Sequence, residues 1–151
     1  MAEGKETYAA RDVINYRIRA QIVWYLETAS SVDEQRKYEK DIIDAQSPGL
    51  VPAEMIEQWA DWVLTEGSDY KSVAIGRYSE PVFTKAEQQA ILDFHKVWNE
   101  TAEATPDPMP CTIEDLIDTP AWDQFVKEAR KALDIFMRRG LLLEEAKFDT
   151  E

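Results

Sequence analysis

The stretch from residue 119 to residue 140, TPAWDQFVKEARKALDIFMRRG, most constrains the fold, because each part of it specifies one amphipathic helix. Thr119 can cap the N-terminus, and Pro120 suits the first helical position, where its missing N–H costs nothing. Gly140 supplies the left-handed residue that commonly ends a helix. Eight apolar side chains share an arc of about 140°: Trp122, Phe125, Val126, Ala129, Ala132, Leu133, Phe136 and Met137. Such a wide stripe requires partner helices to cover it.

The rest of the chain carries similar helix signals. Capping-box spacings begin at Ser31 and Thr84, and Pro52 suits the first turn of another helix. The predicted helices cover residues 8–29, 31–46, 52–66 and 84–102, with a short helical turn at 112–118. The proline-rich segment 105–110, TPDPMP, predicts an extended linker.

The least regular stretch is residues 68–83, where Val73 and Ile75 alternate weakly with small residues. A short strand or hairpin around Gly76 would explain this pattern, and a connection of this length is more often functional than average. The predicted fold class is therefore all-α, an irregular bundle of five or six helices with one long loop or small hairpin near residues 68–83. We expect a single domain over residues 1–151, with short flexible termini.

The formal net charge of −13 restricts the binding partners. Such a field repels nucleic-acid phosphates and anionic membranes, and it favours a basic protein partner. The sequence contains no run of about 18 apolar residues, which is the length that a membrane-spanning helix requires. The single Cys111 excludes an internal disulfide, and the first ten residues lack a basic start followed by an apolar run. We therefore expect a cytoplasmic protein that binds neither nucleic acid nor membrane.

Catalytic and metal-binding patterns are weak. His95 is the only histidine, and it shares an apolar helix face with Ile91 and Trp98, so we interpret it as a core residue. One histidine and one cysteine exclude a conventional zinc site, and we expect no metal and no cofactor. Carboxylates stack at i, i+3 and i+7 on residues 54, 57 and 61, which is typical of a solvated helix face. These observations favour a protein that is not an enzyme.

The irregular loop carries the most informative polar residues, Tyr70, Lys71, Arg77 and Tyr78. The two cations lie where basic residues are scarcest, and the two tyrosines could orient an anionic or planar ligand. No glycine-rich phosphate motif accompanies them. We interpret the loop as a site for a partner or ligand, with His95 as a further candidate.

The first helix carries two apolar stripes rather than one. Ile14, Ile18, Ile22 and Tyr25 lie roughly opposite a second row that includes Val13, Tyr16, Ala20, Val23 and Trp24. One neighbouring surface can cover only one row, although a helix in the centre of a domain is covered on both sides. Arginines at positions 11, 17 and 19 flank the rows, as at an interface with an apolar centre and a charged rim. We therefore expect part of the Ile14 row to form a docking surface or a homodimer.

Two functions follow from these patterns. The leading hypothesis is a non-enzymatic protein-interaction module, such as an adaptor, an inhibitor or an immunity-type protein, with an acidic surface. The alternative is a small-molecule-binding helical domain or an enzyme, with its pocket between the Trp59/Trp62 helix, the His95 helix and the loop at 70–78. We interpret the tryptophans at 24, 59, 62, 98 and 122 as core residues, because each lies on the apolar side of a predicted helix. A tightly closed tryptophan core favours the first function, and an open pocket with converging polar groups favours the second.

Overall fold

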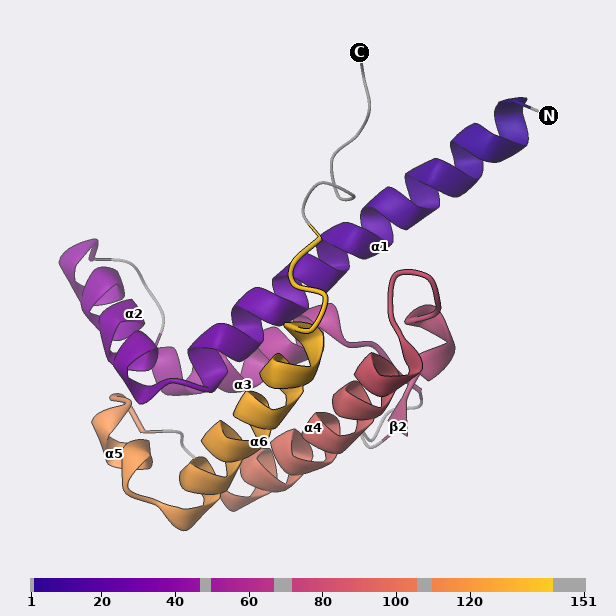
Figure 1. Ribbon diagram of the computed structural model, residues 1–151. Helices are drawn as coiled ribbons and strands as arrows, with labels where there is room; N and C mark the ends of the chain where they lie inside the picture. Colours follow the sequence, from indigo (N-terminus) through magenta and orange to yellow (C-terminus); the bar gives the residue numbers. More distant parts are fainter. Residues whose placement is uncertain (1, 47–49, 67–71, 106–109, 143–151) are drawn as a thin grey trace.

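A computed structural model describes residues 2–46, 50–66, 72–105 and 110–142, with side chains in the first helix from Val13 onward. The prediction of an all-α bundle with one small hairpin is confirmed (Figure 1). The elements are α1 (Ala2–Ala29), α2 (Val32–Asp44), α3 (Val51–Trp62), β1 (Thr65–Glu66), β2 (Ser72–Val73), the 3-10 helix η1 (Ile75–Arg77), α4 (Lys85–Ala104), α5 (Glu114–Ile117) and α6 (Pro120–Phe136).

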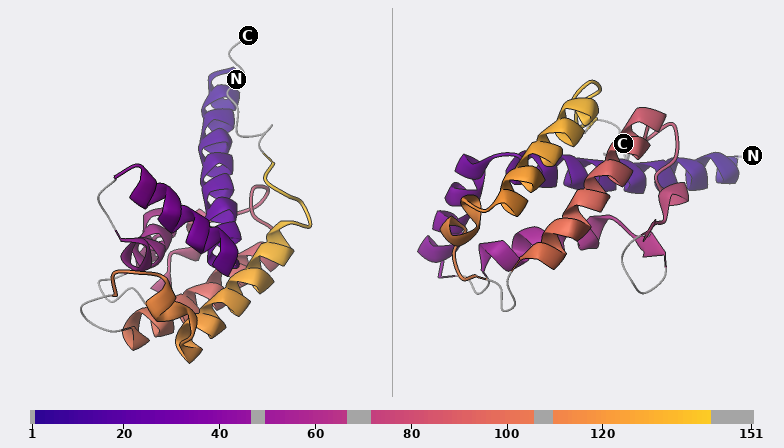
Figure 2. Two further views of the ribbon diagram at one scale, coloured as in Figure 1. Left: turned by 90° about the vertical axis from the view of Figure 1, so that its left-hand side faces the viewer. Right: turned by 90° about the horizontal axis from the view of Figure 1, so that it is seen from below.

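Four of the helices form the body of the bundle. Helices α4 and α6 run side by side in opposite directions, and α1 packs against α6 and α3 (Figures 1 and 2). The N-terminal turns of α1 project past the other elements, and α2 turns back from the other end of α1 (Figure 1). Within the described segments, no helix combines the length and the apolar character that a membrane crossing requires.

The helix starts follow the predicted capping signals. Thr119 Oγ1 accepts a hydrogen bond from Trp122 N at 3.3 Å, and Pro120 is the first residue of α6. At α4 the full capping box is present, because Thr84 Oγ1 accepts from Glu87 N at 3.1 Å and Glu87 Oε1 accepts from Thr84 N at 2.8 Å. At α2 only half of the predicted capping box is present, since Ser31 Oγ accepts from Glu34 N at 3.2 Å. Local sequence therefore determines where these helices begin.

The hairpin lies earlier than Gly76. Thr65 pairs with Val73 and Glu66 pairs with Ser72, in antiparallel register, while Gly76 lies in η1. Helix α3 accordingly ends at Trp62 rather than near residue 67, because the following residue is already extended and leads into β1. Most of the predicted linker at 105–110 and the end of the chain lie outside the described residues.

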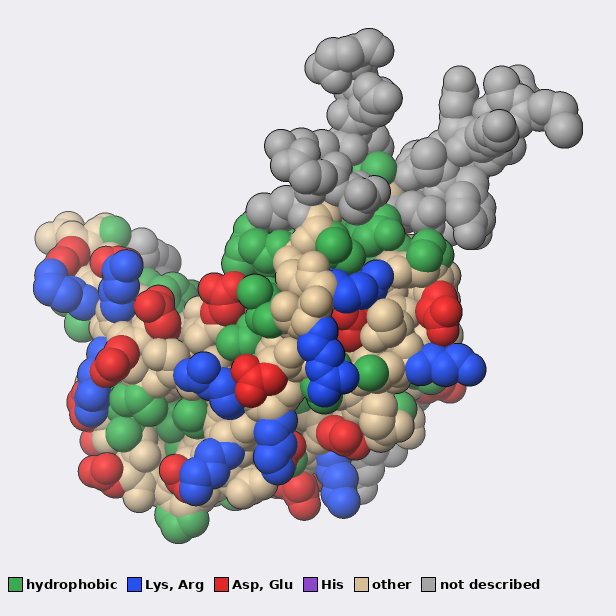
Figure 3. All heavy atoms as spheres, viewed as in Figure 1, with side chains coloured by type: hydrophobic (Ala, Val, Ile, Leu, Met, Phe, Trp, Pro, Cys, Tyr) green, Lys and Arg blue, Asp and Glu red, His purple; other side chains and the backbone are tan. Residues whose placement is uncertain are grey.

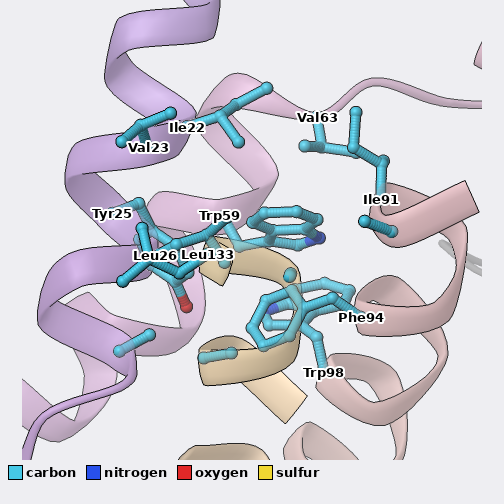
Figure 4. Packing of buried hydrophobic residues seen from close by; sticks show 14 of the residues in the cluster. Ile22, Val23, Tyr25, Leu26, Trp59, Val63, Ile91, Phe94, Trp98 and Leu133 are labelled. Carbon is cyan, nitrogen blue, oxygen red and sulfur yellow. The ribbon is translucent and has the colours of Figure 1, made fainter. Parts of the chain in front are cut away.

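The core is aromatic and centres on Trp59 of α3 (Figure 4). Its ring lies 4.6 Å from Phe94 in an edge-to-face arrangement and 5.5 Å from Tyr25, between centroids. Trp122 is also fully buried, and Trp98 is nearly so. The expectation that every tryptophan faces the core is wrong for Trp24, which is 42% exposed.

A buried charge cluster joins the middle of α1 to the start of α4 and the end of α6. Arg19 of α1 donates to both carboxylate oxygens of Glu87, at 2.6 and 2.8 Å, and both side chains are buried. Arg139, just past α6, donates to Glu87 Oε1 at 2.9 Å. The expectation that Arg19 lies on the rim of an interface is wrong, because its charge is neutralised inside the protein by a carboxylate from α4.

Candidate functional site

The Ile14 row on α1 passes from exposed to buried along the helix. Ile14 is 52% exposed, Ile18 is half-buried, and Ile22 and Tyr25 are buried against the core of the same chain. The expectation that Ile22 contributes to an interface is therefore wrong, since the core already covers it, and Tyr25 keeps only the small accessible part that lines a cavity described below. A docking surface or homodimer at the Ile14 end stays a prediction.

The loop residues do not form one exposed cluster. Tyr70 and Lys71 lie outside the described residues, and Arg77 is exposed on η1. Tyr78 is buried: its hydroxyl donates to Trp62 O at 2.9 Å and accepts from Leu64 N at 2.8 Å. Burial raises the pKa of Tyr78, only partly offset by the Leu64 N–H and the Arg77 charge, so the hydroxyl keeps its proton. Its hydrogen bonds tie the loop to the end of α3 instead of presenting the hydroxyl to a ligand.

His95 lies inside the bundle, as the interpretation of a core residue requires. It is 2% exposed, and its Nδ1 accepts a hydrogen bond from Trp59 Nε1 at 3.0 Å. Its ring lies 5.0 Å from that of Trp98, between centroids. An acceptor Nδ1 carries no proton, so this contact favours the neutral ring with its proton on Nε2.

We expect His95→Gln to lower the free energy of unfolding by about 1–2 kcal/mol, because the substitution removes a buried ring from between two tryptophans. Urea denaturation monitored by circular dichroism measures the loss. Lys96→Gln is the matched control, since its side chain is exposed and should change stability by less than about 0.5 kcal/mol. Equal effects of the two substitutions would contradict a structural role for His95.

A cavity of about 430 Å³ lies beside His95, near the pocket location of the alternative hypothesis. Helix α4 and strand β2 line it with Ser72, Val73, Leu92, His95, Lys96, Asn99 and Glu100. Among the described residues of its lining, the charged groups are one cation and one carboxylate, and the one ring, that of His95, is already hydrogen-bonded to Trp59. The cavity can hold a small molecule, but its lining selects no particular ligand class.

A second cavity, of about 410 Å³, opens between α1, α2 and α3 and has a more distinctive lining. We call it the α1–α3 groove. Four aromatic side chains line it: Trp24, Tyr25, Tyr38 and Trp62. Its polar lining consists of Gln21, Thr28, Glu34, Lys37, Asp41 and Gln58. None of the described residues in this lining is aliphatic, so the groove combines flat rings with hydrogen-bonding and charged groups.

Contacts behind the groove hold its aromatic floor in place. Tyr25 donates its hydroxyl hydrogen to Met55 O, which links α1 to α3, and burial raises the pKa of this hydroxyl well above its ordinary value. Gln58 Nε2 donates to Tyr38 Oη at 3.0 Å, which links α3 to α2. The three helices are thus connected directly beneath the groove.

The charged side chains of the groove lie on α2 and project into solvent. Glu34, Lys37 and Asp41 are exposed and follow one another at i, i+3 and i+7, on one face of the helix. Within the described part of the chain, none of the three side chains forms an ion pair or hydrogen bond. The groove therefore has a formal charge of −1, carried by carboxylates whose oxygens are open to a ligand.

Sequence reasoning assigned Trp24 to the core, although a local signal points to the surface. Its neighbours one helical turn away, Gln21 and Thr28, are both polar, and all three line the same groove.

The stack of carboxylates at Glu54, Glu57 and Asp61 lies on α3 as expected, and the side chains of Glu57 and Asp61 are exposed. Among the described residues, no three His, Cys, Asp or Glu side chains cluster closely enough to hold a metal ion.

No family model, characterised protein or solved structure matches this chain.

Proposed function

We propose that this protein is a non-enzymatic interaction module for a basic protein partner. The observation that carries the proposal is the α1–α3 groove, where exposed Trp24 lies with three further aromatic side chains and two carboxylates that make no ion pair with a described residue. Aromatic residues near the centre of an interface contribute much of its binding energy, and carboxylates around them select a cationic partner. An adaptor, an inhibitor and an immunity-type protein would each use such a surface.

The acidity of α3 supports the same proposal. Residues 50–66 contain four carboxylates and no Lys, Arg or His. Glu57 and Asp61 are exposed, and neither pairs with a described residue. On the face seen in Figure 3, by contrast, blue and red side chains are interspersed. On α6, for example, Lys127 pairs with Asp123 at 2.9 Å, and the two charges neutralise one another. Unneutralised carboxylates attract a basic partner over distances of about 8–10 Å and raise its association rate.

Capture from the native source with matched charge variants tests this function. The bait Glu57→Lys/Asp61→Lys reverses two unpaired charges on α3, and Glu103→Lys/Asp134→Lys makes the same change on exposed positions of α4 and α6. We expect wild type and the second variant to retain the same basic protein, and the first variant to lose it about 10-fold or more. Raising the salt from 0.05 to 0.5 M should release this protein, since screening weakens surface electrostatics.

Three results would contradict the proposal. The captured protein could be acidic, both variants could retain it equally, or wild type could retain nothing that survives washing at low salt. Circular dichroism of both baits controls for folding, and all four substituted positions are exposed. A partner identified in this way is then tested as a purified protein.

The cavity beside His95 favours a second candidate, the binding of a small molecule. This candidate predicts a compound that stays with the purified protein during native desalting and is released on denaturation, where mass spectrometry detects it. A protein that is lost selectively from the α3 variant supports the interaction module, and a retained compound supports this alternative.

A further inference from the structure

We infer that the α1–α3 groove receives an arginine side chain of the protein partner. This inference rests on the proposed function and specifies the chemistry at its centre. The juxtaposition of rings from three helices with carboxylates from α2 carries it.

The rings provide surfaces on which a guanidinium can stack. Trp24 is 42% exposed, and the rings of Tyr38 and Trp62 are half-buried in the walls of the same groove. A cation over the face of tryptophan or tyrosine is attracted by the negative face of the ring, and guanidinium stacks there more often than ammonium does. The exposed face of Trp24 is therefore a binding surface rather than a packing defect.

The carboxylates provide acceptors for the guanidinium N–H groups. Glu34 and Asp41 lie two helical turns apart at the edge of the groove, and neither makes an ion pair with a described residue. A carboxylate matches the planar fork of arginine with two parallel hydrogen bonds, which an ammonium group cannot form. Lys37 lies between the two carboxylates and competes with an incoming cation.

Other ligand classes fit this groove less well. An anion would meet two carboxylates and a single lysine. An aliphatic side chain would remove water from six polar side chains without supplying the hydrogen bonds that they lose. Arginine satisfies both parts of the lining, because its alkyl stem and flat guanidinium cover rings while its five N–H groups reach oxygens. The volume of about 410 Å³ also admits the backbone that carries the side chain.

The groove is held in shape before a ligand arrives. Tyr25 is fixed by its bond to Met55 and by its contact with the Trp59 ring at 5.5 Å, and Tyr38 is fixed by Gln58. A preformed site loses little side-chain entropy on binding. We therefore expect a single arginine to bind measurably outside the context of its partner.

The test uses a pentapeptide with arginine at the centre of four glycines, and a twin in which citrulline, an uncharged isostere, replaces the arginine. Nuclear magnetic resonance of the full ¹⁵N-labelled chain follows the indole N–H signals during titration. We expect the arginine peptide to shift the signals of Trp24 and Trp62, with a dissociation constant in the millimolar range, and the citrulline peptide to bind at least about 10-fold more weakly. A lysine peptide should fall between the two.

Some variants should weaken the binding of the arginine peptide and one should strengthen it, which distinguishes an effect on the binding site from a loss of folding. Trp24→Ala should weaken the binding of the arginine peptide about 3- to 10-fold, and Trp24→Phe should restore part of it. Asp41→Asn should also weaken binding, whereas Lys37→Gln should strengthen it about 2- to 5-fold by removing the competing cation. A general loss of folding cannot produce an increase in affinity.

The inference is overturned if the arginine and citrulline peptides bind equally, if the shifts map outside the groove, or if no shift occurs at 20 mM peptide. If one of these three results occurs and the α3 charge variant still loses the captured basic partner, the arginine pocket is rejected. The proposed function then stands without it. Retention of that partner by the α3 variant, together with arginine-specific shifts in the groove, would overturn the proposed function and leave the pocket.

Discussion

Replacing Glu87 by glutamine is expected to lower the free energy of unfolding by about 3–5 kcal/mol, because the change leaves Arg19 buried without a counter-charge. Glutamine has the same shape but no charge, and it can satisfy only part of the hydrogen bonds that Arg19 and Arg139 now donate. Equilibrium urea unfolding measures the loss.

Glu114→Gln is the matched control. Glu114 accepts from Arg36 at 2.6 Å, as short as the bond between Arg19 and Glu87, but both side chains of that pair are exposed. Exposed pairs contribute about 0–1 kcal/mol, so this variant should differ little from wild type. If both substitutions cost the same, burial would not determine the strength of the Glu87 cluster.

The cluster also predicts how stability depends on pH. Burial alone would raise the pKa of Glu87, but the hydrogen bonds from Arg19 and Arg139 outweigh it and hold the pKa below its ordinary value of 4.5. A carboxyl whose pKa is lower in the folded state stabilises the fold above its unfolded-state pKa and loses this contribution as the pH falls through the folded-state pKa. The stability gap between wild type and Glu87→Gln should therefore be widest at pH 7 and narrow below pH 4.5. A gap that stays constant through this range would contradict the assignment.

The helix boundaries of this protein could be predicted because they depend on local chemistry. Thr84 and Thr119 cap helices through hydrogen bonds that span three residues, and the apolar stripe of α6 repeats every turn. The prediction of a hairpin within residues 68–83 is only partly correct, because β2 lies in this range but β1 begins at Thr65. Its position depends on where α3 ends, and no residue of strong helix-ending character stands at that point.

The buried charge cluster could not be predicted, because its partners are 68 residues apart. The sequence pattern places Arg19 between two apolar rows of a helix and Glu87 in a capping box. Each position is explained by its own helix, so neither indicates a partner elsewhere in the chain. Only packing of α1 against the start of α4 brings the two charges together. Glu87 serves both purposes, accepting from Thr84 N and from Arg19 with the same oxygen.

The α1–α3 groove was missed for a related reason. A helix with two apolar rows does not specify which row its neighbours cover, and here α3 covers Tyr25 while Trp24 remains at the edge. The groove exists because α2 turns back beside α1 and brings Tyr38 and two carboxylates near Trp24. Residues from three helices form the lining of the groove, so the periodicity of a single helix could not predict it.

Replacing Trp122 by alanine is expected to lower the free energy of unfolding by about 3–5 kcal/mol, a large share of a typical domain's stability. Trp122 is fully buried and stacks on Phe125 with a centroid separation of 4.6 Å. Its Nε1 donates to Gln35 Oε1 at 2.9 Å, and Gln35 is itself fully buried. Alanine would leave both a cavity between α2 and α6 and a buried amide oxygen without a donor.

Two further variants separate these effects. Trp122→Phe keeps much of the ring volume but removes the donor to Gln35, so it should cost about 1–3 kcal/mol. Trp24→Ala removes a ring of the same type from the exposed wall of the groove and should cost less than about 1 kcal/mol. Urea unfolding of all three variants gives this order directly. If Trp24→Ala destabilised the protein as much as Trp122→Ala does, Trp24 would be part of the core, and its exposed ring could not be kept free for a ligand.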